Sequence, residues 1–436
     1  MMNIFIVFTL IVILMISMYK LFQVNRRNDK TVGACSGALF AFIMYYCCVP
    51  ILVTCFSGVE EKNSYIKTIL TAGLEEYILV FIGLIIFLAV FLGTYKRYNK
   101  KRSSDKYIFS EAKWVRVAKF VTISTFVVGG GSFLIYILAF GGVSQLLSYA
   151  EYLRSFAYSG SSVVSYIASI MVIPARLITV TPVVAITLCG NKTKNHGIYR
   201  IIFIVSIIMT IIFNMANAGR TSVILFALIF GIPMMEKVFK HPWRIAIIIG
   251  LFSLPILGLL DSFFVYISGM GWSYESVDAI SYLPQFAYPF SNVLNMTKIV
   301  DLSGFRWGQD FITGVLNIIP GVNFQPSVEP TCYFYGGANW RITGGTPNDI
   351  ITFGYLEFGF VGIVLMAVLL GIFLGKADRM IKTIDSTYAY RVVTTSIIVN
   401  TFAYMINADI ISLVRNQFQY TLVMMCILYS CRRNAM

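Results

Sequence analysis

Long apolar runs recur along the whole chain and are separated by short polar stretches. A membrane-spanning helix needs about 20 predominantly apolar residues, and the pattern predicts eleven such spans. They are residues 3–22, 33–57, 77–95, 118–140, 162–189, 200–217, 221–235, 243–263, 350–375, 391–408 and 416–430. Helices are the expected spanning form, because backbone polar groups in lipid must pair within their own segment. The first run is too long for a signal-peptide core, and no small-residue cleavage site follows it, so it predicts a retained anchor.

The composition agrees with an all-α polytopic membrane protein. Hydrophobic residues make up 58% of the chain and charged residues 12%, whereas a soluble domain carries about 25% charged residues. The mean hydropathy is +0.77. These values exclude a soluble enzyme, a disordered chain, a coiled coil and a secreted disulfide scaffold.

The basic residues indicate how the chain is oriented. Of the 34 Lys and Arg residues, 24 fall in the loops after the odd-numbered spans and at the C-terminus. Nine of them lie in the single stretch 96–119. Because Lys and Arg accumulate on the cytoplasmic side of a membrane, we expect the N-terminus outside the cytoplasm and the C-terminus inside it. The net charge of +14 is then explained by contact with anionic lipid, and nucleic acid is not an expected partner.

One long segment, 264–349, divides the chain into three parts. Spans 1–8 occupy residues 1–263, the segment itself is predicted to be a large outer loop, and spans 9–11 occupy residues 350–436. The loop holds six of the twelve prolines and three of the five tryptophans, so it is too apolar and aromatic for a disordered linker. Runs such as 311–319 are typical of short amphipathic helices on a membrane surface. A loop of this length is usually functional, although a lid that shields the bundle is an alternative.

Arginines dominate the basic residues of the predicted outer side. Arg is costly inside a membrane unless it faces a cavity or a partner, and its guanidinium binds phosphate oxygens in pairs. A phosphate-bearing lipid head group is therefore a candidate ligand, and ordinary ion pairing with Glu151, Asp261 or Asp409 is the alternative. The candidate binding residues are Arg176, Arg220, Arg306, Arg341 and Arg415.

Two acidic residues are the candidate catalytic groups. Asp349 stands at the start of the predicted span 350–375, and Glu357 lies two turns into it, among glycines that permit close helix packing. Glu357 could pair with Arg176 or Arg341, or it could act as a general base or a ligand of a sugar hydroxyl. The chain has no Asp-x-Asp, CxxC or HExxH motif, and both histidines fall in predicted cytoplasmic loops. We expect neither a metal ion nor a cofactor.

The combination resembles the O-antigen polymerases, the Wzy-type oligosaccharide repeat-unit polymerases of the bacterial inner membrane. The segment AGRTS at 218–222 is similar to the family's Gly-Arg-Ser/Thr segment between two spans. The segment GGTPNDIITFGYLEFGFVGIVL at 344–365 is similar to its segment after the large loop. The architecture matches over nearly the whole chain, whereas the motifs are short.

The resemblance implies a fold related to the polyprenyl-dependent membrane glycosyltransferases. It also implies the transfer of a growing glycan from undecaprenyl diphosphate to a new undecaprenyl-diphosphate-linked repeat unit at the periplasmic face. Arginines would hold the diphosphates, and loop aromatics such as Trp307 and Trp340 would stack on sugars. A chain-length regulator and a flippase are the implied protein partners. An O-antigen ligase is the nearest enzyme alternative, but the related ligases use an outer-side histidine that this chain lacks. A lipid-linked oligosaccharide flippase or another transporter is the second alternative.

Overall fold

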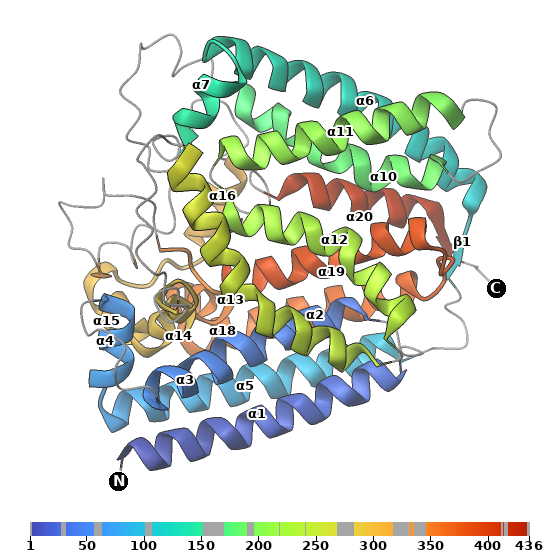
Figure 1. Cartoon of the computed structure of the whole chain (residues 1–436). Helices are drawn as coiled ribbons and strands as arrows, with labels where there is room; N and C mark the ends of the chain where they lie inside the picture. Colours follow the sequence, from blue (N-terminus) through green and yellow to red (C-terminus); the bar gives the residue numbers. More distant parts are fainter. Residues whose placement is uncertain are drawn as a thin grey trace.

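A computed structural model describes residues 2–27, 32–55, 63–100, 107–150, 170–189, 196–217, 219–239, 241–267, 283–316, 330, 333–334, 346–410, 413 and 417–433. The long helices lie side by side, and the two chain ends lie at opposite ends of the bundle (Figure 1). They are α1 (Met2–Arg27), α2 (Ala34–Ile43) with η1 (Met44–Cys48) and α3 (Val49–Cys55), α5 (Leu74–Asn99), α6 (Glu111–Ala139), η2 (Arg176–Thr179) with α10 (Val180–Cys189), α11 (His196–Ala216), α12 (Arg220–Val238), α13 (Pro242–Ile267), α18 (Ile350–Ile381), α19 (Tyr388–Ile406) and α20 (Phe418–Ser430).

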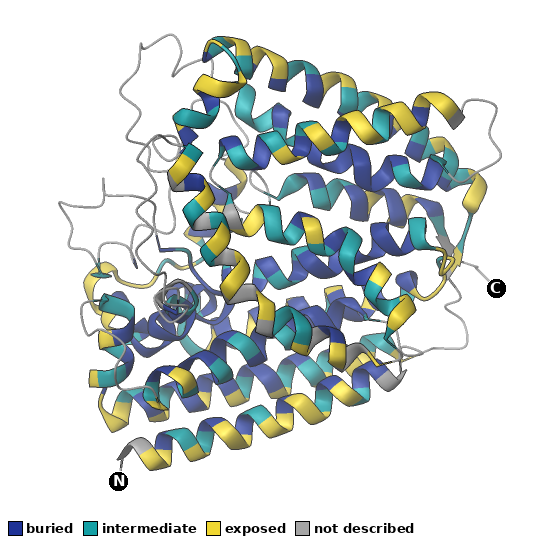
Figure 2. Cartoon of the chain, in the orientation of Figure 1, coloured by how far each residue is buried: buried dark blue, intermediate teal, exposed yellow. Residues whose placement is uncertain are grey.

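The described helices confirm an all-α protein built to cross a membrane. Each of the eleven predicted spans overlaps one of these helices. Among the residues that the structure describes, eight helices are long and apolar enough to cross, and α13, α19 and α20 are not in that group. The count of eleven therefore stays a prediction. Exposed positions lie mainly on the peripheral helices and buried positions on the inner ones (Figure 2). Many of the exposed residues are apolar, such as Phe8 of α1 and Leu138 of α6, as expected for a bundle whose surface faces lipid.

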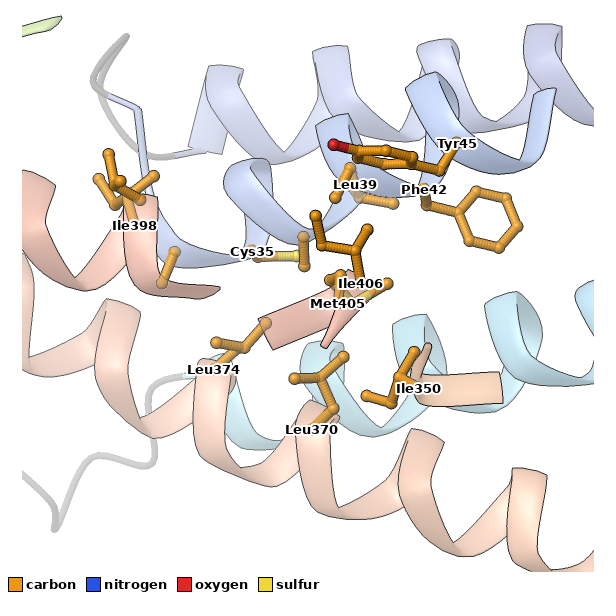
Figure 3. Close-up of a cluster of buried hydrophobic side chains, with 14 of the residues drawn as sticks. Cys35, Leu39, Phe42, Tyr45, Ile350, Leu370, Leu374, Ile398, Met405 and Ile406 are labelled. Atoms are coloured by element: carbon orange, nitrogen blue, oxygen red, sulfur yellow. The ribbon is translucent and has the colours of Figure 1, made fainter. Parts of the chain in front are cut away.

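The most extensive contact between two helices joins the parallel pair α5 and α18. Any Cβ at Gly371 or Gly375 would lie about 3 Å from the carbonyl oxygens of Phe91 or Tyr95 (2.8 and 3.1 Å), so small residues bring the two backbones together. Around this pair, side chains from α2, α18 and α19 form one apolar cluster (Figure 3). A π-helical segment, η1, interrupts the second span just before Pro50. Pro50 has no N–H to continue the helix ladder, which accounts for a local π-bulge.

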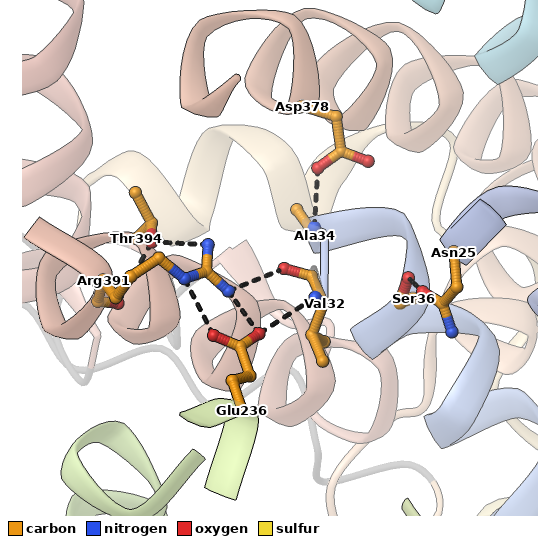
Figure 4. A network of polar contacts seen from close by, with 8 residues as sticks. All are labelled: Asn25, Val32, Ala34, Ser36, Glu236, Asp378, Arg391 and Thr394. Carbon is orange, nitrogen blue, oxygen red and sulfur yellow. Dashed lines mark hydrogen bonds and ion pairs between the residues drawn. The ribbon is translucent and has the colours of Figure 1, made fainter. Parts of the chain in front are cut away.

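A polar network holds the start of α2 at the predicted cytoplasmic end. Oδ1 of Asp378, on α18, accepts from the backbone N–H of Ala34 at 2.6 Å, and Oδ2 accepts from Cys35 N–H at 3.3 Å and from the Tyr95 hydroxyl at 2.8 Å. Nearby, Arg391 makes a bidentate ion pair with Glu236, which also accepts from Val32 N–H (Figure 4). The strands β1 (Tyr107–Phe109) and β2 (Cys431–Arg433) pair antiparallel at the same end. This end also carries Lys96 and Arg97 at the end of α5.

Helix α18 covers the predicted span 350–375 and contains a break that the apolar pattern does not indicate. The backbone leaves the helical region at Phe358 (φ −145°, ψ 27°) and Gly359 (φ 61°, ψ −143°). Beyond this point the chain turns back on itself, because the backbones of Gly354 and Gly362 touch and leave no room for a Cβ on either residue. Residues 350–357 therefore form a short arm that runs toward the predicted outer end, and residues 360–381 form the crossing helix. Gly359 provides the positive φ that the turn requires.

The described part of the 264–349 segment is mostly helical and packs against the bundle. It contains α14 (Pro284–Leu294), α15 (Met296–Ser303) and α16 (Gln309–Leu316), at the same end of the bundle as α4 (Ser64–Thr71). Helix α14 buries Ala287, Phe290 and Val293 almost completely and packs on η1, α4 and α5. It is thus part of the bundle core. Helix α16 exposes Ile312 and Val315, which agrees with the predicted amphipathic run at 311–319 over its described residues. Helix α15 is tied to α5 by the Lys298–Glu76 pair at 3.0 Å, and this hydrogen bond raises the pKa of Lys298.

Candidate functional site

The segment 304–310 wraps around the turn in α18 through backbone hydrogen bonds. Arg306 N–H donates to the carbonyl of Leu356 at 2.9 Å, and Trp307 N–H donates to the carbonyl of Glu357 at 3.1 Å. Gly308 N–H donates to Oε2 of the Glu357 side chain at 2.6 Å. These carbonyls are unpaired where the short arm ends, because a helix terminus leaves its last C=O groups without intrahelical partners. The outer segment satisfies them and is thereby fixed on the turn.

Two acidic side chains and one arginine meet at this turn. Glu357 and Asp310 are each 1% exposed, and their carboxyl groups are within hydrogen-bonding reach of one another. Arg306 pairs with Oδ1 of Asp310 at 2.9 Å, four residues along the chain. Oε1 of Glu357 has no hydrogen-bond donor in the described part of the chain.

The surface of the same segment presents an aromatic side chain. Trp307 is 72% exposed and has a φ of 52°, the one positive φ among the described residues other than glycine. This conformation is strained for a bulky residue, and the three hydrogen bonds to the turn hold it in place. Phe305 and Phe358 flank the indole ring at centroid distances of 5.6 and 6.2 Å. The segment therefore displays an exposed aromatic side chain next in sequence to Arg306, whose side chain is 23% exposed.

An apolar cavity of about 330 Å³ lies beside this site, between the crossing part of α18, α19 and α20. Its wall includes Phe311, which directly follows Asp310 in the chain, and Ile350 at the start of the short arm. Leu369 and Phe373, also in the wall, are 46% and 48% exposed on the lipid-facing surface. The cavity thus extends from the neighbourhood of the carboxyl pair toward the hydrocarbon region of the membrane.

The two predicted catalytic residues lie at opposite ends of the short arm of α18. Glu357 is at the outer turn of α18 and contacts the outer segment. Asp349 is fully buried at the other end of the short arm, where it caps the helix by accepting from Ile351 and Thr352 N–H at 3.0 and 3.1 Å. It therefore does not stand at an open entrance to the span, because the chain reverses after it.

The predicted substrate-binding residues fall into three groups. Arg306 and Trp307 are brought together with Glu357, so Arg306 is a cation beside Glu357 among the described residues. Arg176 begins η2 and lies near Tyr136 of α6. Arg220 begins α12, but its side chain lies outside the described residues, as do Arg341, Arg415 and Trp340 entirely.

Sequence reasoning missed Asp310. The signal was the acidic residue in the first turn of a predicted amphipathic helix, where a negative charge favours the helix N-terminus, four residues after Arg306. In the regions that the structure describes, no group of three or more His, Cys, Asp or Glu side chains could hold a metal ion.

Comparison of the chain with protein-family models, with curated protein sequences and with solved structures finds no match.

Proposed function

We propose that this protein polymerises undecaprenyl-diphosphate-linked oligosaccharide repeat units at the periplasmic face of the bacterial inner membrane. The observation that carries the proposal is the exposed Trp307 held beside Arg306 on the turn of α18. An aromatic face stacks on a sugar ring, and a guanidinium binds phosphate oxygens. A glycan joined to a diphosphate has a sugar ring next to phosphate oxygens, which match the aromatic face of Trp307 and the guanidinium of Arg306.

The reaction consists of one glycosyl transfer. A hydroxyl at the non-reducing end of the acceptor repeat unit attacks the anomeric carbon of the donor glycan and loses its proton. The bond from that carbon to the donor diphosphate breaks, and undecaprenyl diphosphate leaves with the bonding electrons. Negative charge grows on the leaving diphosphate, so preorganised arginines lower the barrier. In the described site, Arg306 provides such a cation.

Glu357 and Asp310 hold this surface in place. Both carboxyl groups are buried, and they contact Arg306 and Gly308, so the geometry supports their role in positioning Arg306 and Trp307. For Glu357 to accept the proton of a sugar hydroxyl as a general base, the hydroxyl must reach Oε1, which has no donor among the described residues but is buried. The general base function is therefore tied to a movement of the segment 304–310.

The carrier lipid also has a place in this scheme. The cavity between α18, α19 and α20 is lined mainly by apolar side chains and is reached from lipid-facing residues. Its volume of about 330 Å³ lies at the lower end of the range of about 300–1,000 Å³ for ligand pockets. A prenyl chain in this cavity would bring its diphosphate to the outer end of the bundle, near Arg306.

A lipid-linked oligosaccharide transporter is the second candidate, and one observation favours it. The short arm of α18 begins inside the bundle at Asp349, and discontinuous helices of this kind form substrate sites in secondary transporters. Against it stands the packed segment 283–316, which holds a fixed binding surface at one end of the bundle.

One reconstitution experiment tests the proposal. The purified full chain is mixed in detergent with lipid-linked repeat units, and the products are resolved by length. Longer lipid-linked chains, formed without a gradient or a second compartment, are the expected result. Repeat units that stay unjoined, while the same protein moves them across a sealed vesicle membrane, would replace the polymerase with a transporter.

Substitutions of arginine locate the diphosphate site. Lys keeps the positive charge but loses the bidentate fork. At a diphosphate contact, Arg→Lys should lower the elongation rate about tenfold or more, by analogy with the loss of one transition-state donor. At an ion pair it should be tolerated, and only Arg→Ala should matter. The set to be compared is Arg176, Arg220, Arg306, Arg341 and Arg415, with Arg244 in the predicted cytoplasmic loop as the control. Near-normal elongation with Lys at all five positions would exclude an arginine clamp.

A further inference from the structure

Two helix breaks meet in the interior of the bundle. Residues 346–349 precede the short arm of α18 without helical structure, and residues 407–409 follow the end of α19 in the same way. Ala408 N–H donates to the carbonyl of Asn348 at 2.8 Å, so the two breaks are in direct contact. Irregular backbone at membrane depth is tolerated where it is buried in protein or lines a polar site.

The contacts of Asp349 show that this meeting point lies at mid-depth. The Tyr46 hydroxyl, in the π-helical segment η1, donates to Oδ1 of Asp349 at 2.6 Å. The ring of Phe42 lies against Tyr46 and also against Phe87, with centroid distances of 5.3 and 6.3 Å. Phe87 stands near the middle of α5, which runs from Leu74 to Asn99. The carboxyl group of Asp349 is therefore about as far from one end of the bundle as from the other.

The two oxygens of this carboxyl group have unequal surroundings. Oδ1 accepts three hydrogen bonds, from the Tyr46 hydroxyl and from the N–H groups of Ile351 and Thr352. Oδ2 accepts none, although Asp349 is fully buried. No salt bridge within the described ranges reaches this carboxyl group. A buried carboxylate at membrane depth is costly unless a positive charge or a proton accompanies it.

Neighbouring side chains add further oxygen atoms to this region. Asn292 of α14 is fully buried and uses its amide N–H for the carbonyl of Pro347 at 2.9 Å, and its Oδ1 has no donor in the described residues. Thr352, also fully buried, brings its hydroxyl to the Asp349 carboxyl group, and its Oγ1 accepts no hydrogen bond from the described residues. Asn348 turns its amide N–H to Oδ1 of Asp409 at 3.2 Å. Oxygen lone pairs on Asn292 and Thr352 are therefore left without donors.

We propose that Asp349, Asn292 and Thr352 bind a small monovalent cation, either Na⁺ or a proton, through their side-chain oxygens. Carboxylate, amide and hydroxyl oxygens are ligands for hard cations. One carboxylate with neutral oxygens balances a single positive charge, whereas the divalent and transition metals use more carboxylate, thiolate or imidazole ligands. The unwound ends of broken membrane helices are a common place for such a cation. The site joins α14, η1 and α18, and it is separate from the Trp307 surface at the outer turn.

Sodium binding can be measured on the purified full chain without any glycan. The melting temperature is followed as Na⁺ replaces choline at constant ionic strength, and equilibrium binding of radioactive sodium gives the number of ions bound. If the cation is Na⁺, the melting temperature rises to a plateau and about one ion binds per chain. Asp349→Asn abolishes both effects. Asn292→Leu, which keeps the carboxyl group and removes one ligand oxygen, weakens sodium binding about tenfold, the scale found for altered metal-site shells.

Asp378→Asn is the matched control. Asp378 is equally buried, but its two oxygens have three donors between them, from Ala34, Cys35 and Tyr95. This variant loses stability and keeps the full response to Na⁺.

If the cation is a proton, sodium has no effect, and the infrared spectrum contains the C=O band of a protonated carboxyl group. That band disappears in Asp349→Asn, persists in Asp378→Asn and shifts in Asn292→Leu. A protein that binds no sodium and has no protonated carboxyl band assignable to Asp349 overturns the proposal. Because the unsubstituted protein already gives the sodium result, a poorly folding variant does not prevent the test.

Discussion

Removal of the Glu357 carboxylate should release the segment 304–310 from the turn of α18. In Glu357→Ala, Gly308 N–H loses its acceptor at 2.6 Å, and Asp310 loses its carboxyl neighbour. The two backbone bonds to Leu356 and Glu357 carbonyls remain. The change is therefore local, and the bundle itself should stay folded.

The size of the effect follows from the lost bond. A hydrogen bond to a charged group contributes about 1.5–3 kcal/mol to stability, and each 1.4 kcal/mol changes an equilibrium about tenfold. Opening of the segment should become roughly 10 to 150 times more frequent in Glu357→Ala. Glu357→Gln keeps a neutral acceptor, so a loss of about 1 kcal/mol and a roughly fivefold change are expected.

Hydrogen–deuterium exchange resolved on the peptide that covers 304–310 measures this opening directly. The order of exchange rates should be Glu357→Ala, then Glu357→Gln, then the unsubstituted protein. Glu75→Ala, at an exposed position of α5, is the control and should leave the rate unchanged. Equal exchange in all four proteins would refute the view that Glu357 anchors this segment, and the position of Trp307 would need another explanation.

Four further predictions concern packing, recognition, chemistry and topology. Gly362→Leu places a side chain against the backbone of Gly354 and should destabilise the protein by about 3 kcal/mol. Its control is Gly93→Leu, at a site with no atom within 4 Å of an added Cβ, which should leave the melting temperature nearly unchanged. Trp307→Ala should weaken binding of a lipid-linked glycan on the order of tenfold or more, whereas Trp307→Phe keeps a stacking face and should bind nearly normally; equal losses in both would argue against stacking. EDTA should leave elongation intact, because guanidinium groups supply the positive charge, and activity restored by one particular cation would contradict the arginine-based scheme. A reporter fused after Trp307 should be active only outside the cytoplasm, and activity confined to the cytoplasm would invert the predicted topology.

The sequence alone determined the class of protein and the position of its helices. Apolar runs of spanning length are local features, and a helix satisfies its backbone within the same segment, so each run could be located without knowledge of its neighbours. The orientation was predicted in the same way, because the accumulation of basic residues at 96–119 can be counted from local composition. In the structure the C-terminal end of α5 and the β1–β2 pair lie at one end of the bundle, and α14–α16 lie at the other (Figure 1).

Only the tertiary structure decided where the polar residues in the last third of the chain lie. The run 350–375 has one continuous apolar pattern, but Phe358 and Gly359 reverse the chain within it. The reversal depends on a backbone contact between Gly354 and Gly362 and on hydrogen bonds from the segment 304–310, which is distant in sequence. It places Glu357 at the outer turn and Asp349 in the interior, although both were expected near one end of a straight helix. Hydrophobic periodicity indicates the type of a local segment and which of its residues are apolar. It contains no information about a turn that residues distant in sequence stabilise.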